Sequence, residues 1–325
     1  MNTNIVSLLQ GAAIAFAIVV GLAALAAIIF VKPVRNWVFG ASKLRAYIWA
    51  SLVSQILIVV TGGAVRLTGS GLGCPTWPKC TPESLVNVPE MGIHGIIEFT
   101  NRLLTFVLIV ISLLTFITIR RLSAVERRGM VWPALAIGLG IFGQAVIGGI
   151  SVLTKLNPWV VGLHFVLSAA LIAIATILVI RFYGVSQAPV ATASRLLAWP
   201  IALVGLVTLL VGIVVTGAGP HAGDVAAPRN GLDLEILEHT HAYPAYLLLA
   251  MSLIALNRQL RAGKNKRLAR IQVALVLAEL AQAAIGIAQA RLGVPPLLVG
   301  AHMLGASILA ALLTANLVVS RTSKR

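Results

Sequence analysis

The sequence predicts an all-α integral membrane protein with two pseudo-repeated four-helix transmembrane bundles and an extra N-terminal transmembrane helix. Three observations support this fold class. Hydrophobic residues make up 59% of the 325 residues and charged residues only 10%, which is more apolar surface than a soluble fold can hide. Apolar stretches recur at the length of about 20 residues that a membrane helix requires. Motifs of the first half also return in the second half.

Nine apolar stretches are long enough to cross a membrane as helices. The first has no charged side chain and exceeds the apolar core of about 7–15 residues found in signal peptides, so we expect a spanning helix there. In chain order the stretches cover approximately residues 5–31, 47–66, 94–119, 131–153, 158–180, 197–217, 236–256, 270–290 and 297–320.

Basic residues cluster between alternate stretches, and the positive-inside rule places these segments in the cytoplasm. We therefore expect a multi-pass protein of the cell membrane with its N-terminus outside and its C-terminus in the cytoplasm. This topology explains the net charge of +16 without a nucleic-acid partner. The clusters lie in residues 32–45, 120–128, 181–195, 258–270 and 321–325.

An internal repeat defines the expected domains. The stretch VVTGGAV at 59–65 returns as VVTGAGP at 214–220, and GLHFVLSAAL at 162–171 returns as GAHMLGASIL at 300–309. Repeated membrane halves commonly hold sites inside each half or between them. The expected segments are an additional helix with its cytoplasmic link (1–45), a first four-helix bundle (46–181), a cytoplasmic linker (182–195), a second four-helix bundle (196–320) and a cytoplasmic tail (321–325).

The stretch RLTGSGLGCPTWPKC, residues 66–80, holds the only two cysteines of the chain. The topology places this loop outside the cytoplasm, where thiols oxidise readily. Its glycines and prolines allow turns that bring Cys74 and Cys80 within bonding reach, so we expect a disulfide. The alternative is two unpaired thiols in a mobile loop; a structural zinc site would need four ligands.

The histidines gather toward the outer ends of the expected helices. His241 and His302 lie on two helices of the second bundle, and two imidazoles facing each other across a four-helix bundle suit the axial positions of haem iron. A single histidine at such a place is also a common interfacial hydrogen-bonding residue. His239 is two residues from His241 and points elsewhere on the helix, so we expect it to contact a propionate or an iron-binding residue rather than to bind the iron itself.

The first half differs at one of these positions. IIEFTNRLL at 96–104 aligns with ILEHTHAYP at 236–244, so Asn101 stands opposite His241, while His164 matches His302. Glu98 and Arg102 lie one helical turn apart on the same face. They either form a structural ion pair or belong to a second site, with the carboxylate at the reacting edge and Arg102 or Arg66 as propionate partners.

GGAVRLTGSGLGCPTWPKC, HGIIEFTNRLLTF and the two G(L/A)H helices, together with the repeat, resemble the haem A synthase family over about residues 46–320. The resemblance implies a haem b on His241 and His302. It implies haem O as substrate in the first half, with Glu98 as the catalytic carboxylate and His164 as a ligand. The implied reaction converts the C8 methyl of haem O to the formyl of haem A, for terminal oxidase assembly. Haem O synthase as supplier, a membrane electron donor and a homo-oligomer are the partners that we associate with it.

Two departures from the family pattern leave questions open. Many members have a histidine where this chain has Asn101, so either His164 is the only ligand of the first half or His94 replaces the missing one. The additional first helix has no assigned role. Glu279 inside the eighth stretch is either a proton-path group or a hydrogen-bonded packing residue.

Two rival functions remain. A bis-histidine cytochrome b that only transfers electrons would explain His241 and His302 but not Glu98 or the cysteine loop. A transporter built from repeats would place polar groups near the midplane, whereas these lie toward the outer ends.

Overall fold

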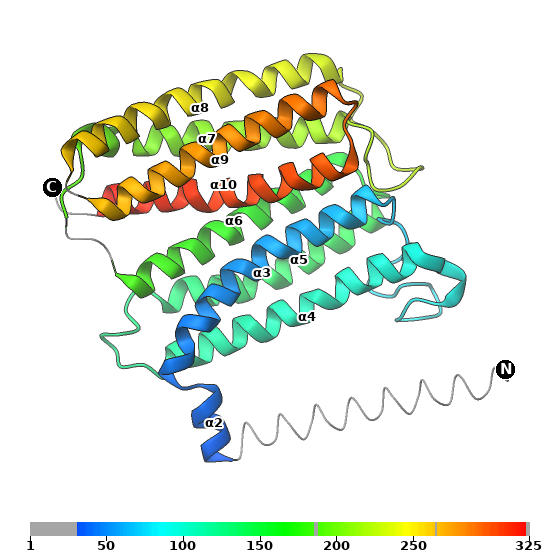
Figure 1. The fold of residues 1–325 in the computed structure, drawn as a ribbon. Helices are drawn as coiled ribbons and strands as arrows, with labels where there is room; N and C mark the ends of the chain where they lie inside the picture. Colours follow the sequence, from blue (N-terminus) through cyan, green and yellow to red (C-terminus); the bar gives the residue numbers. More distant parts are fainter. Residues whose placement is uncertain (1–30, 185–187, 264, 323–325) are drawn as a thin grey trace.

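The computed structural model describes residues 31–184, 188–263 and 265–322 (Figure 1). Within these ranges the chain is helical and contains no strand. The expected first span, residues 5–31, lies outside the described residues except for its last position. The described helices are α2 (Lys32–Val38), α3 (Ala41–Leu67), the short 3₁₀ helix η1 (Pro89–Met91), α4 (Gly92–Arg120), α5 (Val131–Leu153), α6 (Pro158–Tyr183), α7 (Thr192–Ala218), α8 (Leu234–Ala262), α9 (Lys266–Arg291) and α10 (Pro296–Thr322).

Seven of the described helical segments are long and apolar enough to cross a membrane. They are α3, α4 together with η1, α5, α6, α7, α9 and α10. Helix α8 covers the expected span at 236–256 but is not among them, because polar and charged residues occupy both of its ends. The prediction of an all-α, multi-pass membrane protein is therefore confirmed.

The long helices pack as two sets of four. In the first set, here called the N-terminal bundle, α3 contacts α4, α4 contacts α5, α5 contacts α6, and α6 returns to α3. In the second set, the C-terminal bundle, α7, α8, α9 and α10 close a ring in the same way. The two sets lie side by side in Figure 1. Helix α10 contacts both α3 and α6, and α6 also contacts α7, so these helices form the junction of the bundles.

The start of α8, which carries His241, is fixed by a side-chain cap. Asp233 occupies the N-cap, and its Oδ1 accepts a hydrogen bond from the backbone N–H of Ile236 at 2.9 Å. Such a cap satisfies one of the free N–H groups of the first turn. Helix α6, which carries His164, begins similarly: Oδ1 of Asn157 accepts a hydrogen bond from the backbone N–H of Trp159. Pro158 occupies the first helical position, where its missing N–H costs nothing.

Candidate functional site

His241 and His302 meet inside the C-terminal bundle. They come from α8 and α10, which are diagonal to each other in the ring of helices. Their ring centroids are 6.4 Å apart and the ring planes are inclined at 73°. Two imidazoles on one metal ion, each at a metal–nitrogen distance of about 2.0–2.1 Å, place their ring centres roughly 6 Å apart. The spacing of this pair therefore fits two axial ligands of one iron.

The ring nitrogens support the same interpretation. Nδ1 is buried in both His241 and His302, and in His164 of the N-terminal bundle, and none of these three atoms has a hydrogen-bond partner among the described residues. Buried polar atoms in folded proteins are almost always paired. A histidine that binds metal gives one ring nitrogen to the ion and its other to a hydrogen-bond partner. Each of these imidazoles therefore has one ring nitrogen, Nδ1, that is free to bind a group from outside the described residues.

A glycine lies against each of the three rings. A Cβ atom on Gly212 of α7 would lie 2.9 Å from Cε1 of His241, and one on Gly148 of α5 would lie 3.2 Å from Cε1 of His164. The corresponding distance from Gly286 of α9 to Cε1 of His302 is 3.7 Å, an ordinary contact. The absence of a side chain at Gly212 therefore leaves space for the ring of His241, and its absence at Gly148 leaves space for the ring of His164.

A glutamine holds the backbone of the histidine in each bundle. Nε2 of Gln144 donates to the carbonyl oxygen of His164 at 3.1 Å and to Oγ of Ser168 at 2.6 Å. Nε2 of Gln282 donates to the carbonyl oxygen of His302 at 3.0 Å. In both bundles the glutamine thus precedes the histidine by 20 residues and donates a hydrogen bond to its carbonyl oxygen.

Glu98 is buried near the N-terminal end of α4, with 5% of its surface exposed. Its Oε1 accepts two hydrogen bonds from Arg102, at 3.1 Å from Nε and 2.5 Å from Nη2, and its Oε2 accepts from the backbone N–H of Cys74. Arg102 also donates to the carbonyl oxygens of Cys74, Thr76 and Lys79. The ion pair therefore fastens the cysteine loop to α4.

The predicted disulfide between Cys74 and Cys80 is present, and both residues are fully buried. The loop packs closely against the end of the N-terminal bundle, because a Cβ atom on Gly149 of α5 would overlap the indole of Trp77. The cysteine loop is thus a fixed cover on this bundle.

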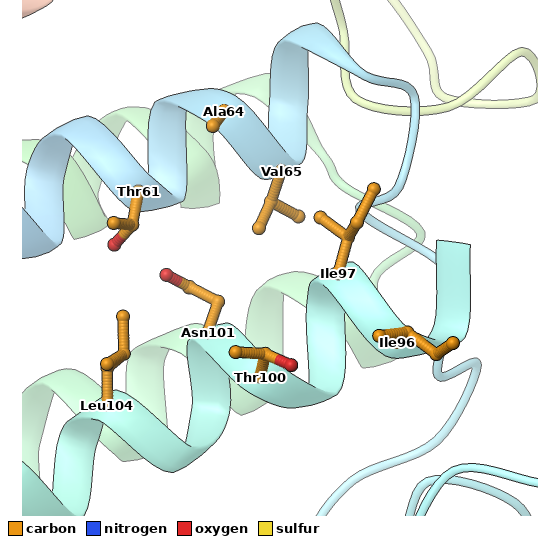
Figure 2. Close-up of a pocket in the computed structure, with 8 residues that line it drawn as sticks. All are labelled: Thr61, Ala64, Val65, Ile96, Ile97, Thr100, Asn101 and Leu104. Atoms are coloured by element: carbon orange, nitrogen blue, oxygen red, sulfur yellow. The ribbon is translucent and has the colours of Figure 1, made fainter. Parts of the chain in front are cut away.

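Asn101 lines a pocket of about 290 Å³ between α3 and α4. Figure 2 shows its amide pointing across the gap toward Thr61 of α3. Oδ1 of Asn101 is buried without a hydrogen-bond partner among the residues that the structure describes. The rest of the lining is mostly apolar: Ala64, Val65, Ile96, Ile97, Thr100 and Leu104. Glu98 is not part of this lining, although it lies on the same helix.

His94 and His239 differ in exposure from the half-buried His164, His241 and His302. Both are exposed. Nδ1 of His94 is 2.8 Å from Oγ of Ser70, at hydrogen-bond distance, in the loop that follows α3. No hydrogen bond or ring contact joins His94, Glu98 or Asn101 to His164 in the described part of the chain. Among the expected site residues, the structure thus pairs His241 with His302 and Glu98 with Arg102.

Arg66, near the end of α3, joins the two bundles. Its Nη2 donates to the carbonyl oxygen of Thr216 at 2.6 Å, and its Nε donates to the carbonyl oxygen of His221. His221 in turn donates from Nε2 to the carbonyl oxygen of Val294 at 2.8 Å. Two donor positions of Arg66 are therefore used within the protein, and its expected role toward a propionate stays a prediction.

Sequence reasoning missed the glycines at the histidine rings and the attachment of the cysteine loop by Arg102. The repeat held a signal for the former: Gly148 and Gly286 occupy matching positions, each four residues after the conspicuous glutamines Gln144 and Gln282. No local pattern indicated that Arg102 reaches back to residues 74–79.

A family profile described as cytochrome oxidase assembly protein matches residues 45–314. The chain belongs to this family. The matched range includes helices α4 to α9, most of α3 and α10, the cysteine loop, and His94, His164, His239, His241 and His302.

Individual proteins are also similar to this chain. A Heme A synthase of Lysinibacillus sphaericus is 33% identical over 135 residues, 41% of this chain and 43% of that protein. A Heme A synthase of Staphylococcus epidermidis is 27% identical over 212 residues, 59% of this chain and 68% of that protein. A protoheme IX farnesyltransferase of Thermus thermophilus is 40% identical over 62 residues, 19% of this chain and 10% of that protein. The aligned region spans about half the length of the first relatives, 43% and 47% for two of them.

Proposed function

We propose that this protein is a haem A synthase, which oxidises the C8 methyl group of haem O to a formyl group for the assembly of terminal oxidases. The observation that carries the proposal is the pair of half-buried imidazoles from His241 and His302, in a chain of the cytochrome oxidase assembly family. Methyl oxidation of this kind replaces two hydrogens by one oxygen atom, which side chains alone cannot do. A redox cofactor is therefore required.

In this proposal the C-terminal bundle holds a haem b between His241 and His302. Bound there, the haem would supply one-electron transfer. The protein keeps both imidazoles in place by the contact of Gly212 with His241 and by the hydrogen bond from Gln282 to the backbone of His302. Because two histidines would hold the iron there, this half is assigned to electron transfer.

The N-terminal bundle is assigned to the substrate haem O, with His164 as its iron ligand. The same diagonal relationship applies, since α4 and α6 correspond to α8 and α10 in the repeat. At the position that matches His241 this bundle has Asn101, whose amide is a poor ligand for iron, so His164 would hold the substrate haem without a second histidine at that position. We infer that the two bundles are structural repeats with different tasks.

Glu98 is assigned the role of proton acceptor during oxidation of the methyl group, because each oxidation step releases protons. It is a buried ionisable group at the outer end of the substrate bundle. Its ion pair with Arg102 holds the carboxylate in one place, and Arg102 and Arg66 are the candidate cations for propionates. Removing Glu98 tests whether this group serves catalysis or only the attachment of the loop.

The proposed topology places the cysteine loop, the histidines and both haem sites toward the outer side of the cell membrane. The disulfide supports this placement, since such bonds persist in oxidising compartments. Haem O synthase is the proposed supplier, and the match to a protein named protoheme IX farnesyltransferase supports a place in the same pathway. A membrane electron donor and terminal oxidase assembly complete the proposed partners.

The direct test is production of the protein in cells that make haem O but lack any source of haem A. Haem A should appear in the extracted pigments only when the chain is present. A bis-histidine cytochrome b, the second candidate, is favoured by the same histidine pair. It would give bound haem b and leave haem O unchanged.

A further inference from the structure

Glu279 is a buried carboxyl in the middle of α9 that the proposed reaction does not use. Only 6% of its surface is exposed. Oε1 accepts a hydrogen bond from Oγ of Ser252 on α8 at 2.8 Å, and Oε2 is buried without a partner among the described residues. A buried carboxyl without a cation is costly in a membrane helix and commonly marks a proton relay.

Further polar side chains continue from Glu279 toward the opposite end of the bundle from the histidines. Gln259 and Gln272 lie two turns away from Ser252 and Glu279 on the same faces of α8 and α9. Both are buried, with 1% exposed, and Nε2 of Gln272 donates to Oδ1 of Asn316 on α10 at 3.2 Å. Each of these three amides has one buried atom without a partner in the described ranges: Nε2 of Gln259, Oε1 of Gln272 and Nδ2 of Asn316.

Gln259, Gln272, Glu279 and Asn316 are here called the polar column. The end of this column that lies away from the histidine pair reaches the surface. Gln259 lines a pocket of about 110 Å³ at the turn between α8 and α9, together with Asn265 and Lys266. The positive-inside rule places this turn in the cytoplasm. Buried polar atoms that lack a protein partner are usual positions for bound water. A water-bridged route from the cytoplasmic pocket to Glu279 is the natural way to satisfy them.

The upper end of the column is next to the histidine pair. Gln282 lies three residues beyond Glu279, about 4.5 Å along the axis at about 1.5 Å per residue. Its amide binds the carbonyl oxygen of His302. A charge on Glu279 would consequently interact with a charge on iron through a medium of low dielectric constant, where such interactions are strong.

The N-terminal bundle provides an internal comparison. In the alignment that pairs Gln144 with Gln282 and Glu98 with Glu238, the four polar residues of the column correspond to buried apolar residues. Gln259, Gln272, Glu279 and Asn316 correspond to Ile119, Ala134, Ile141 and Leu178, respectively. The same fold therefore forms without these polar groups, and the column is confined to the bundle with the histidine pair.

Other titratable groups are remote from Glu279. Helix α9 packs against α8 and α10. On α8, no titratable residue lies within five positions of Ser252. On α10, the titratable residues lie toward the ends of the helix. On α8 they are Glu235, Glu238, His239, His241, Tyr243, Tyr246, Arg258 and Arg261; on α10 they are His302 and Arg321; on α9 itself they are Glu279, Lys266, Arg267, Arg270 and Arg291.

We propose that Glu279 takes up a proton from the cytoplasmic side, through this column, when the iron held by His241 and His302 is reduced, and releases it on oxidation. One electron enters the iron from a one-electron reductant, and one proton converts the carboxylate of Glu279 to the carboxylic acid. The net charge of the site is thereby unchanged. This inference rests on the haem b site of the proposed function.

The test is a redox titration of the purified haem-loaded protein at several pH values. For the wild type, the midpoint potential should rise as pH falls, by up to about 59 mV for each tenfold change in proton concentration for one electron. Glu279→Gln should flatten this dependence while the haem content and spectrum stay the same. Ser252→Ala keeps the carboxyl and should keep the slope. A Glu279→Gln protein with the wild-type slope would overturn the proposal.

A second measurement on the wild type decides the question if Glu279→Gln does not retain haem. Reduction should produce the infrared C=O band of a newly protonated carboxylic acid, and absence of this band would overturn the proposal. The outcome for the proposed function is separate: a protein that shows the pH-dependent potential but leaves haem O unchanged contradicts only the synthase activity. A wild type without bis-histidine haem contradicts both.

Discussion

The imidazole of His241 on α8 meets the imidazole of His302 on α10 edge-on, with ring centroids 6.4 Å apart. The two residues are distant in sequence and their helices are diagonal in the C-terminal bundle, so only the closed ring of four helices brings them together. Both rings retain a buried nitrogen without a protein partner in the described part of the chain. The predictions below follow from this pair and from its counterpart in the other bundle.

Replacing either His241 or His302 by alanine should remove the low-spin signal of haem b, because six-coordinate iron needs both imidazoles. The measurement is the visible and electron paramagnetic resonance spectrum of the purified protein. His239→Ala is the matched control, since His239 lies on the same helix but is exposed, and it should keep the signal. Intact low-spin spectra in both single variants would show that the ligands lie elsewhere.

Gly212→Val should weaken haem binding in the C-terminal bundle. A Cβ atom there would lie 2.9 Å from Cε1 of His241, closer than real Cβ contacts, so the ring must move away. Gly286→Ala is the control, because its Cβ would lie at an ordinary 3.7 Å from His302. Haem content per protein should fall at least severalfold in the first variant and stay near wild type in the second. Equal haem content in both would contradict the steric role of Gly212.

Glu98→Gln should retain haem b and lose most of the haem O oxidation, because the amide keeps the shape of the side chain but cannot accept the released proton. The measurement is the ratio of haem A to haem O in the extracted pigments. Glu238→Gln, at the matching position of the other bundle, should have a smaller effect. An active Glu98→Gln protein would reduce Glu98 to its structural contacts with Arg102 and Cys74.

Arg102→Ala should destabilise the end of the N-terminal bundle that contacts the cysteine loop, on the order of 3 kcal/mol, because it leaves the buried Glu98 carboxylate without its cation. It also removes the donors to the carbonyl oxygens of the cysteine loop. Thermal unfolding and the rate of disulfide reduction measure these effects. The double variant with Glu98→Ala should lose less stability than the sum of the single changes. Strict additivity would argue against a coupled pair.

His94→Ala and His164→Ala distinguish the two candidate ligands of the substrate haem. His164 has a buried Nδ1 without a partner in the described residues, whereas His94 is exposed and within hydrogen-bond distance of Ser70. We therefore expect His164→Ala to lose haem O and His94→Ala to spare most of it. Pigment extraction measures both. Equal losses would indicate that His94 replaces the histidine absent at Asn101.

Much of the fold could be predicted from the sequence because membrane helices leave a strong composition signal. The apolar stretches predicted the described long helices, and the loop composition predicted the disulfide between Cys74 and Cys80. Helix α8 is the informative exception: it forms at the expected place but is less apolar than its neighbours, since its first turns carry the polar residues of the site. The first expected span falls outside the described residues.

The site could be predicted less completely, because its contacts cross between helices. The repeat indicated that His241 and His302 belong to one bundle, and helical spacing indicated the pair of Glu98 and Arg102. Helical spacing could not indicate that Arg102 binds the carbonyl oxygens of the cysteine loop, because this loop precedes Arg102 by more than twenty residues. The polar column below the histidine pair was visible only as the isolated Glu279, because its members come from three helices.

The central claim is that one chain holds two haems on different histidines, and pigment extraction from two variants tests it most directly. His302→Ala should lose haem b, while His164→Ala should keep haem b and lose haem O and haem A. The account would be contradicted if both variants lost the same pigments. It would also be contradicted if His302→Ala retained haem b.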